Sequence, residues 1–239
     1  MVGRISRSGG SSAGCACDGN ISGNVDFVVL EEIDMIDGID PSPVLAGRLL
    51  VASPKLSDSN FDRSIVLLLE HRPEGALGVI LNQPSITKVH DVLTGEWEPY
   101  VEVAPPAVVF AGGPVSPAAA IGLGHCLDLD VMNFLDGAGS STARGPVSYL
   151  FNGICVVDLS TSSEDLTPSV DCIRVFFGYA GWGPGQLENE IDSGAWITVE
   201  SITNDVFTAY PERLWHDVLF RQEGDLAIMA NYPIHPRLN

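Results

Sequence analysis

Runs of apolar residues, separated by short turns rich in Gly, Pro and Asp, dominate the chain from about residue 44 onward. Ser64–His71 is apolar at consecutive positions, which is typical of a central strand that is buried on both faces of a sheet. Arg72–Gly75 has the composition of a turn, and Ala76–Asn82 predicts the strand that follows it. Together these segments predict a β-hairpin.

The remaining apolar runs predict further strands and a few short helices. We expect strands over Leu45–Ser53, Val108–Ala111, Ala120–Leu127, Tyr149–Leu159, Cys172–Tyr179, Ala195–Glu200 and, as a last short strand, Ala227–Ile228. We expect helices over Thr87–Leu93, after the capping pattern Thr161–Glu164, from the second glycine-rich turn to about Ser193, and over Pro211–Arg221. Because strands outnumber helices and the early strands form hairpins, we predict an α+β fold, a single compact domain with a mixed, mainly antiparallel sheet flanked by short helices.

The first 43 residues differ in composition from this domain. Residues 1–24 are rich in Gly, Ser and Asn and are expected to be disordered. Residues 25–43 alternate acidic and apolar groups, and they either form a partly ordered tail or dock on the domain or on a partner. We therefore divide the chain into an acidic tail, residues 1–43, and a domain, residues 44–239, in which residues 128–147 form a linker.

The net charge of the chain is −19, and most of it belongs to the domain. Residues 44–239 carry 10 Lys and Arg against 24 Asp and Glu, which gives −14. Such a surface repels nucleic-acid phosphates and anionic lipid headgroups, so direct nucleic-acid binding is not expected. No apolar run approaches the roughly 18 residues of a membrane span, and no apolar signal-peptide segment is visible, so we expect a cytoplasmic protein.

The cysteines and tryptophans are expected to serve packing. Cys126, Cys155 and Cys172 lie in apolar runs, and Cys15-x-Cys17 has no matching second pair, so neither a metal nor another cofactor is predicted. His125 stands beside Cys126, but neighbours on a strand point to opposite faces, which argues against a Cys–His dyad. Trp182 lies in a glycine-rich turn and is expected to be partly exposed. In the helix over Pro211–Arg221 we expect Trp215 on a flank and an inward side formed by Leu214, Val218 and Leu219.

Two glycine-rich turns, Gly112–Pro114 and Gly181–Gly185, could present backbone amides to an anion. Neither is followed by the Lys-Ser/Thr pair of a phosphate loop, and Glu188 and Glu190 would repel an anion at the second turn. A purely architectural role for both turns is the alternative. Likewise, His71 is either a base or a residue that closes the hairpin end.

Short motifs follow one another along the domain, and they resemble the AlgH/YqgE family of bacterial proteins over about residues 46–237. The motifs are Gly47–Pro54, Asn60–Val66, Glu70-His71, Glu74–Asn82, Gly112–Val115, Asp158–Thr161 and Gly178–Glu188. The resemblance implies a compact α+β domain with a mixed sheet. It implies no established activity and no catalytic residues, although one branch of the family has been labelled a regulator of alginate gene transcription.

Two functions remain open. The first is a cytosolic, non-enzymatic protein that binds a protein partner or a small ligand, with gene regulation through protein partners as one form of it. The second is an enzyme or a small-anion-binding protein that gathers Arg63, His71, Asn82 and the Gly181–Glu188 turn in one cleft, and convergence in a pocket would distinguish it. The candidate ligand or partner surface comprises Arg63, His71, Asn82, Gly113, Trp182, Gly183, Gln186 and Glu188.

Overall fold

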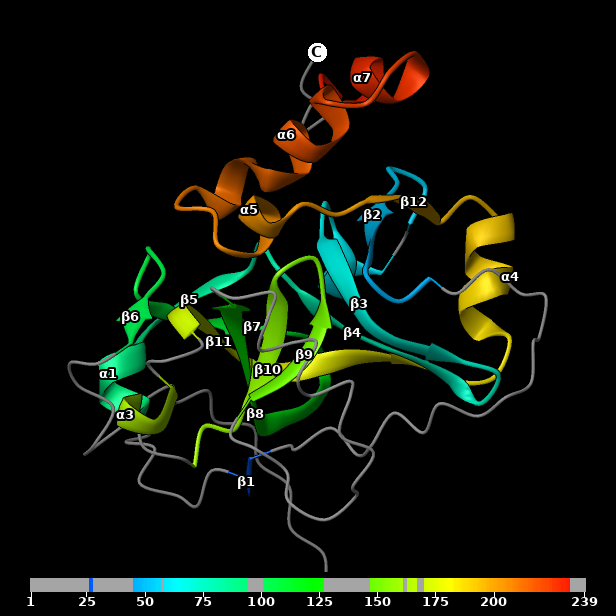
Figure 1. Cartoon of the computed structure of the whole chain (residues 1–239). Helices are drawn as coiled ribbons and strands as arrows, with labels where there is room; N and C mark the ends of the chain where they lie inside the picture. The colour runs from blue at the N-terminus through cyan, green and yellow to red at the C-terminus, as the bar shows by residue number, and fades with distance from the viewer. Residues whose placement is uncertain are drawn as a thin grey trace, which may run out of the picture.

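The computed structural model describes residues 26–27, 45–56, 58–93, 101–126, 147–160, 163–166 and 170–232. Within these residues the chain forms strands and short helices (Figure 1). The strands are β1 (Asp26–Phe27), β2 (Arg48–Ala52), β3 (Ile65–Arg72), β4 (Gly75–Ile80), β5 (Pro84–Lys88), β6 (Glu102–Val103), β7 (Val108–Ala111), β8 (Val115–Cys126), β9 (Val147–Phe151), β10 (Ile154–Val157), β11 (Val170–Trp182) and β12 (Trp196–Glu200). The α-helices are α1 (Val89–Val92), α3 (Ser163–Leu166), α4 (Gln186–Asp192), α5 (Thr203–Val206), α6 (Leu214–Phe220) and α7 (Asp225–Met229), with 3-10 turns at Ser59–Phe61 and Pro211–Arg213.

The described strands join into one curled sheet in the order β12-β2-β3-β4-β11-β8-β10-β9. The neighbours on this path are antiparallel, whereas β6 and β7 pair with β11, and β1 with β8, in the parallel direction. The predicted fold class, α+β with a mixed and mainly antiparallel sheet, is therefore confirmed, and so is the hairpin of β3 and β4.

Strand β11 links the two halves of the sheet. Its first part pairs with β8, and its last residues, Ala180–Trp182, pair with Ala76–Gly78 of β4. Between these parts the pairing with β8 shifts at Gly178, whose φ of +70° lies in the left-handed region that favours glycine. The bend lets one strand belong to both halves and carries its end to the β3–β4 hairpin.

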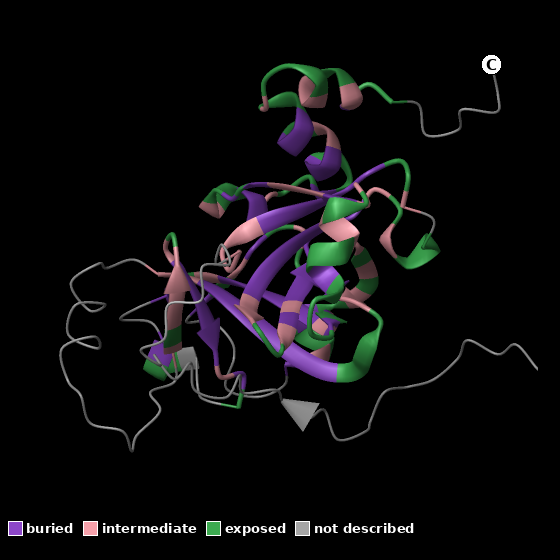
Figure 2. Cartoon of the chain, turned by 90° about the vertical axis from the view of Figure 1, so that its right-hand side faces the viewer, coloured by how far each residue is buried: buried purple, intermediate pink, exposed green. Residues whose placement is uncertain are grey.

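Buried apolar side chains lie on both faces of the curled sheet. One face packs under α5, α6 and α7, with Leu214, Val218 and Leu219 buried as predicted. A second cluster surrounds Trp182 and Trp196 beside α4, and a third lies near α1 and α3. Figure 2 shows the buried residues concentrated in the strands and the exposed ones on the outer helices and turns.

Several predicted elements need correction. Tyr149–Leu159 is not one strand, because Asn152 and Gly153 adopt φ of +51° and +75° and turn the chain between β9 and β10. Ala227–Ile228 is part of helix α7 and not a strand. Trp215 is buried and not on a flank, since its indole N–H donates to Ala52 O at 3.0 Å across the core.

Other predictions lie outside the described residues. These are the tail, apart from the two residues of β1, the capping residues Thr161 and Ser162, and residues 128–146 of the predicted linker 128–147. The last residue of that linker, Val147, is the first residue of strand β9. In the part of the chain that the structure describes, no helix has the length and apolar character needed to cross a membrane.

Candidate functional site at the end of the β3–β4 hairpin

The predicted site residues lie at opposite ends of strand β3. Arg63 precedes the strand and His71 is close to its end, and the eight residues of β3 span about 26 Å when extended. Asn82 lies with Arg63, because its side-chain amide donates to Arg63 O at 2.9 Å. The prediction of a single cleft holding Arg63, His71, Asn82 and the Gly181–Glu188 turn is therefore wrong, since the length of the hairpin separates its members.

Arg63 connects this end of the hairpin to the C-terminal part of the chain, whereas Asn82 holds the start of β3. Asn82 Oδ1 accepts the backbone N–H of Ile65 at 2.9 Å. Arg63 Nη2 donates to Tyr232 O at 2.5 Å, and the guanidinium lies 4.6 Å from the centroid of the Trp215 ring. These contacts give both residues a structural role at this end of the hairpin.

Gly113 is a point of close backbone contact between the β7–β8 connection and β11. A Cβ atom at this position would lie 2.2 Å from the carbonyl carbon of Tyr179, and the φ of Gly113 is +153°. The preceding Gly112 is equally involved, since its N–H donates to Phe177 O at 2.7 Å. The first glycine-rich turn is therefore architectural.

The other end of β3 brings together two predicted site residues that are 117 positions apart in the chain. His71 Nε2 lies 2.7 Å from Glu188 Oε1, and His71 Nδ1 accepts the backbone N–H of Leu45 at 3.3 Å. A ring nitrogen that accepts a hydrogen bond carries no hydrogen, so Nε2 holds the hydrogen and donates it to Glu188. Both ring nitrogens are occupied and the side chain is only 7% exposed, so His71 links the end of the hairpin to α4.

Glu190, which was not among the predicted site residues, organises the second glycine-rich turn. Its Oε2 accepts the indole N–H groups of Trp182 at 3.0 Å and Trp196 at 2.8 Å, and its Oε1 accepts from Gln186 Nε2 at 2.9 Å. Gln186 Oε1 in turn accepts the N–H of Gly183 at 3.1 Å. Trp182 is therefore buried at 7% exposure, and the prediction that it is partly exposed is wrong, because its polar atom has a partner inside the protein.

The backbone amides of this turn are used within the turn itself. The N–H of Gln186 donates to Gly183 O and the N–H of Asn189 to Gly185 O. Helix α4 has only seven residues, and Glu188 adds negative charge to its first turn. Hydrogen bonds from its own backbone N–H and from His71 lower the pKa of the Glu188 carboxyl and keep it ionised. The geometry gives no support to an anion site built from this turn with Arg63 and His71.

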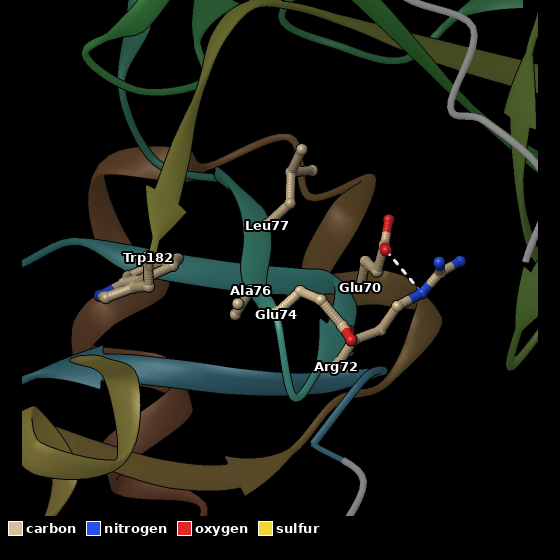
Figure 3. Close-up of a pocket in the computed structure, with 7 residues that line it drawn as sticks. Glu70, Arg72, Glu74, Ala76, Leu77 and Trp182 are labelled. Atoms are coloured by element: carbon tan, nitrogen blue, oxygen red, sulfur yellow. Dashed lines mark ion pairs between the residues drawn. The ribbon is translucent and has the colours of Figure 1, made fainter. Parts of the chain in front are cut away.

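A hollow of about 340 Å³ opens across the start of β4 (Figure 3). Glu70 Oε1 and Arg72 Nε form an ion pair at 2.7 Å on one side of Ala76, and Trp182 lies on the other side. The hollow is lined by Glu70, Arg72, Glu74, Gly75, Ala76, Leu77 and Trp182. The composition of Arg72–Gly75 predicts a turn and gives no sign of the hollow beside it. The signal that could have located the hollow is the set of charged residues Glu70, Arg72 and Glu74 at one hairpin end.

The hollow holds no group of residues arranged for a metal ion. Among the described residues that arrangement occurs at His125, Asp171 and Cys172, near the other end of β11.

Known proteins of similar sequence cover most of the chain. The family model described as DUF179, AlgH-like, matches residues 49–227. The UPF0301 protein SCO2948 of Streptomyces coelicolor is 46% identical over 207 residues, which are 85% of this chain and 100% of that protein. A UPF0301 protein of Thermobifida fusca is 46% identical over 196 residues, 82% of this chain and 96% of its own length.

Solved structures agree with this relationship. The crystal structure of protein DIP2367 from Corynebacterium diphtheriae has a TM-score of 0.67 and 31% sequence identity, and the match covers 80% of this chain and 93% of that one. The solution structure of the AlgH protein from Pseudomonas aeruginosa has a TM-score of 0.55 and 24% identity, covers 83% of this chain and 98% of that one, and shares the fold. The predicted resemblance is confirmed, and the chain belongs to the AlgH-like family.

Proposed function

We propose that this protein is a non-enzymatic binding protein whose hairpin hollow accepts a Lys or Arg side chain from a protein partner. The observation that carries the proposal is the lining of the hollow, in which the carboxylates of Glu70 and Glu74 stand beside an apolar floor at Ala76 and Trp182. A Lys or Arg side chain has an apolar stem, which fits the apolar floor, and a charged end, which fits the carboxylates.

Charge supports the same class of partner. The domain carries a net charge of −14, from 10 Lys and Arg against 24 Asp and Glu, and this field attracts a basic protein segment and repels DNA. Arg72 already pairs with Glu70, and both side chains are about one-third exposed, at 36% and 29%. Because exposed ion pairs contribute only about 0–1 kcal/mol, an incoming cation can join or replace this pair at little cost.

An enzymatic role has less support. His71 has both ring nitrogens occupied and does not line the hollow. The described side chains that do line it include no Ser, Thr, Cys or Lys. A role in gene regulation would depend on the same binding step. The protein would act through a basic protein partner and not through contact with DNA.

The test is a titration of the purified full chain with short synthetic peptides that carry one Arg, one Lys or one Glu. We expect the Arg and Lys peptides to shift the backbone amide NMR signals of residues 70–72 and 74–77, and the Glu peptide to leave them unchanged. The Glu70→Gln/Glu74→Gln double variant should bind at least about tenfold more weakly, which corresponds to about 1.4 kcal/mol.

The matched control is the Glu212→Gln/Glu223→Gln double variant, which also removes two carboxylates, from exposed positions before and after α6. It should bind the Arg peptide like the unaltered chain. Equal weakening by both variants, or shifts that map away from the hairpin, would refute a site in this hollow and leave only general attraction by the acidic surface.

A further inference from the structure

At the start of β11 a histidine, an aspartate and a cysteine come together from two neighbouring strands. Cys172 of β11 is directly opposite His125 of β8, so their side chains share one face of the sheet. The pairing shifts between Val170 and Cys172, and the extra residue, Asp171, turns its carboxylate to His125, with Oδ1 at 2.8 Å from Nδ1. The potential ligand atoms of the three residues all lie within 4.8 Å of one another.

We propose that His125, Asp171 and Cys172 bind a divalent transition-metal ion of the zinc class. Imidazole nitrogen, carboxylate oxygen and thiolate sulfur are the three ligand types that zinc accepts in proteins. Three protein ligands leave one coordination position open, as in sites that bind an exchangeable fourth ligand, whereas closed structural sites use four.

The observed geometry is close to what such an ion needs. Ligand atoms bound tetrahedrally at about 2.0–2.3 Å lie about 3.3–3.8 Å from one another. The Nδ1–Oδ1 separation of 2.8 Å must open slightly, and the widest separations in the group must close. The side chains of His125 and Asp171 are 35% and 42% exposed, so they are free to make this adjustment and an ion can reach them.

A buried arginine next to the cluster supplies an independent reason for an anionic group there. Arg174 lies two residues beyond Cys172 on the same face of β11 and is 1% exposed. Its Nη2 donates to Pro105 O at 2.6 Å and to Thr208 O at 2.9 Å, whereas Nε and Nη1 have no hydrogen-bond partner among the described residues. The guanidinium lies 4.3 Å from the centroid of the Phe110 ring, which offsets part of the cost of burying its charge. A metal-bound thiolate at Cys172 would add a negative charge nearby and offset more of it.

The other two described cysteines belong to the opposite face of the sheet. Cys155 donates to Gly124 O at 3.4 Å, and its thiol also contacts that of Cys126. Cys126 follows His125 directly, so its side chain points away from the cluster. Cys126 is therefore a control that is close in sequence and chemistry but lies outside the proposed site.

The test is a titration of the reduced, metal-free full chain with Co²⁺, followed by absorption spectroscopy. We expect one ion per chain and the near-ultraviolet sulfur-to-cobalt charge-transfer band that reports a thiolate ligand. Cys172→Ser should lose the band, and Asp171→Asn should weaken binding by more than the about 10- to 100-fold typical for residues that only support a metal ligand. Asp171 is exposed, so its variant should fold normally, which thermal unfolding will check.

Two controls keep the test specific. Cys126→Ser should retain the charge-transfer band, and Cys15→Ser/Cys17→Ser should retain it as well, which separates the cluster from the tail. The proposal is overturned if cobalt binds without the band, if Cys126→Ser and Cys172→Ser behave alike, or if the tail variant abolishes binding.

Discussion

Glu190 Oε2 accepts the indole N–H of Trp196 at 2.8 Å, and the same oxygen accepts that of Trp182 at 3.0 Å. We expect Glu190→Ala to lower the free energy of unfolding by about 2–3 kcal/mol, because two largely buried N–H groups lose their acceptor. Urea denaturation measures the loss. Asp192→Ala, an exposed change in the same helix, should stay within about 0.5 kcal/mol of the unaltered chain, and an equal loss there would contradict the assignment.

The contact between His71 and Glu188 should make stability depend on pH. Hydrogen bonds from its own N–H and from His71 lower the pKa of Glu188 below the ordinary value of 4.5 in the folded state. The stabilisation is then complete above about pH 4.5 and is lost as the pH falls through the lowered folded-state pKa.

Unfolding free energies of the unaltered chain and of Glu188→Gln, measured from pH 7 down to pH 3, check this dependence. The difference between the two proteins should shrink below about pH 4.5. The exposed change Glu212→Gln should give a much flatter difference, and a constant difference for Glu188→Gln would show that the hydrogen bond contributes nothing through ionisation.

The side chain of Arg63 makes stabilising contacts, but its backbone is in an unfavourable conformation. Its φ of +51° lies in the left-handed region. Arg63→Ala should destabilise the protein, because it removes the contacts with Tyr232 O and the Trp215 ring while keeping the strain. Arg63→Gly removes the same contacts and relieves the strain, so it should be more stable than Arg63→Ala by about 1 kcal/mol. Thermal unfolding of both variants gives the comparison, and an Ala variant as stable as the Gly variant would contradict it.

Gly113 should tolerate no larger side chain. Gly113→Ala puts a Cβ atom 2.2 Å from the carbonyl carbon of Tyr179, and we expect a loss of at least about 3 kcal/mol or failure to fold. Gly185→Ala is the matched control, since its φ is +69° and nothing lies within 4 Å of the added atom. That variant should lose only about 1 kcal/mol of strain energy, as judged by urea denaturation.

The pattern of apolar and polar residues along the chain is sufficient to predict the β3–β4 hairpin. It is not sufficient to predict which residues meet at the end of that hairpin. The uninterrupted apolar run at Ser64–His71 predicted a buried central strand, and β3 is one. Asn152-Gly153 is a recognised signal for a two-residue hairpin turn, but the apolar residues on both sides made Tyr149–Leu159 look continuous.

Both the hairpin end and the His125–Asp171–Cys172 cluster depend on contacts between residues far apart in the sequence, which no local pattern encodes. His71 meets Glu188 only because β11 crosses to β4 and returns the chain to the hairpin end. Asp171 meets His125 only because the pairing shifts by one residue at that point, and such an irregularity leaves no periodic trace in the sequence.

Strand β11 pairs with both halves of the sheet, and this affects how the chain folds during its synthesis. Ala76 of β4 pairs with Trp182 of β11, and Ala52 of β2 pairs with Trp196 of β12. Strands β2 and β4 therefore leave the ribosome long before the strands that pair with their edges. Until then the emerging polypeptide carries an unfinished and strongly apolar hairpin, which is the kind of segment that nascent-chain chaperones protect. Folding must therefore be completed late, by closure over a long sequence distance.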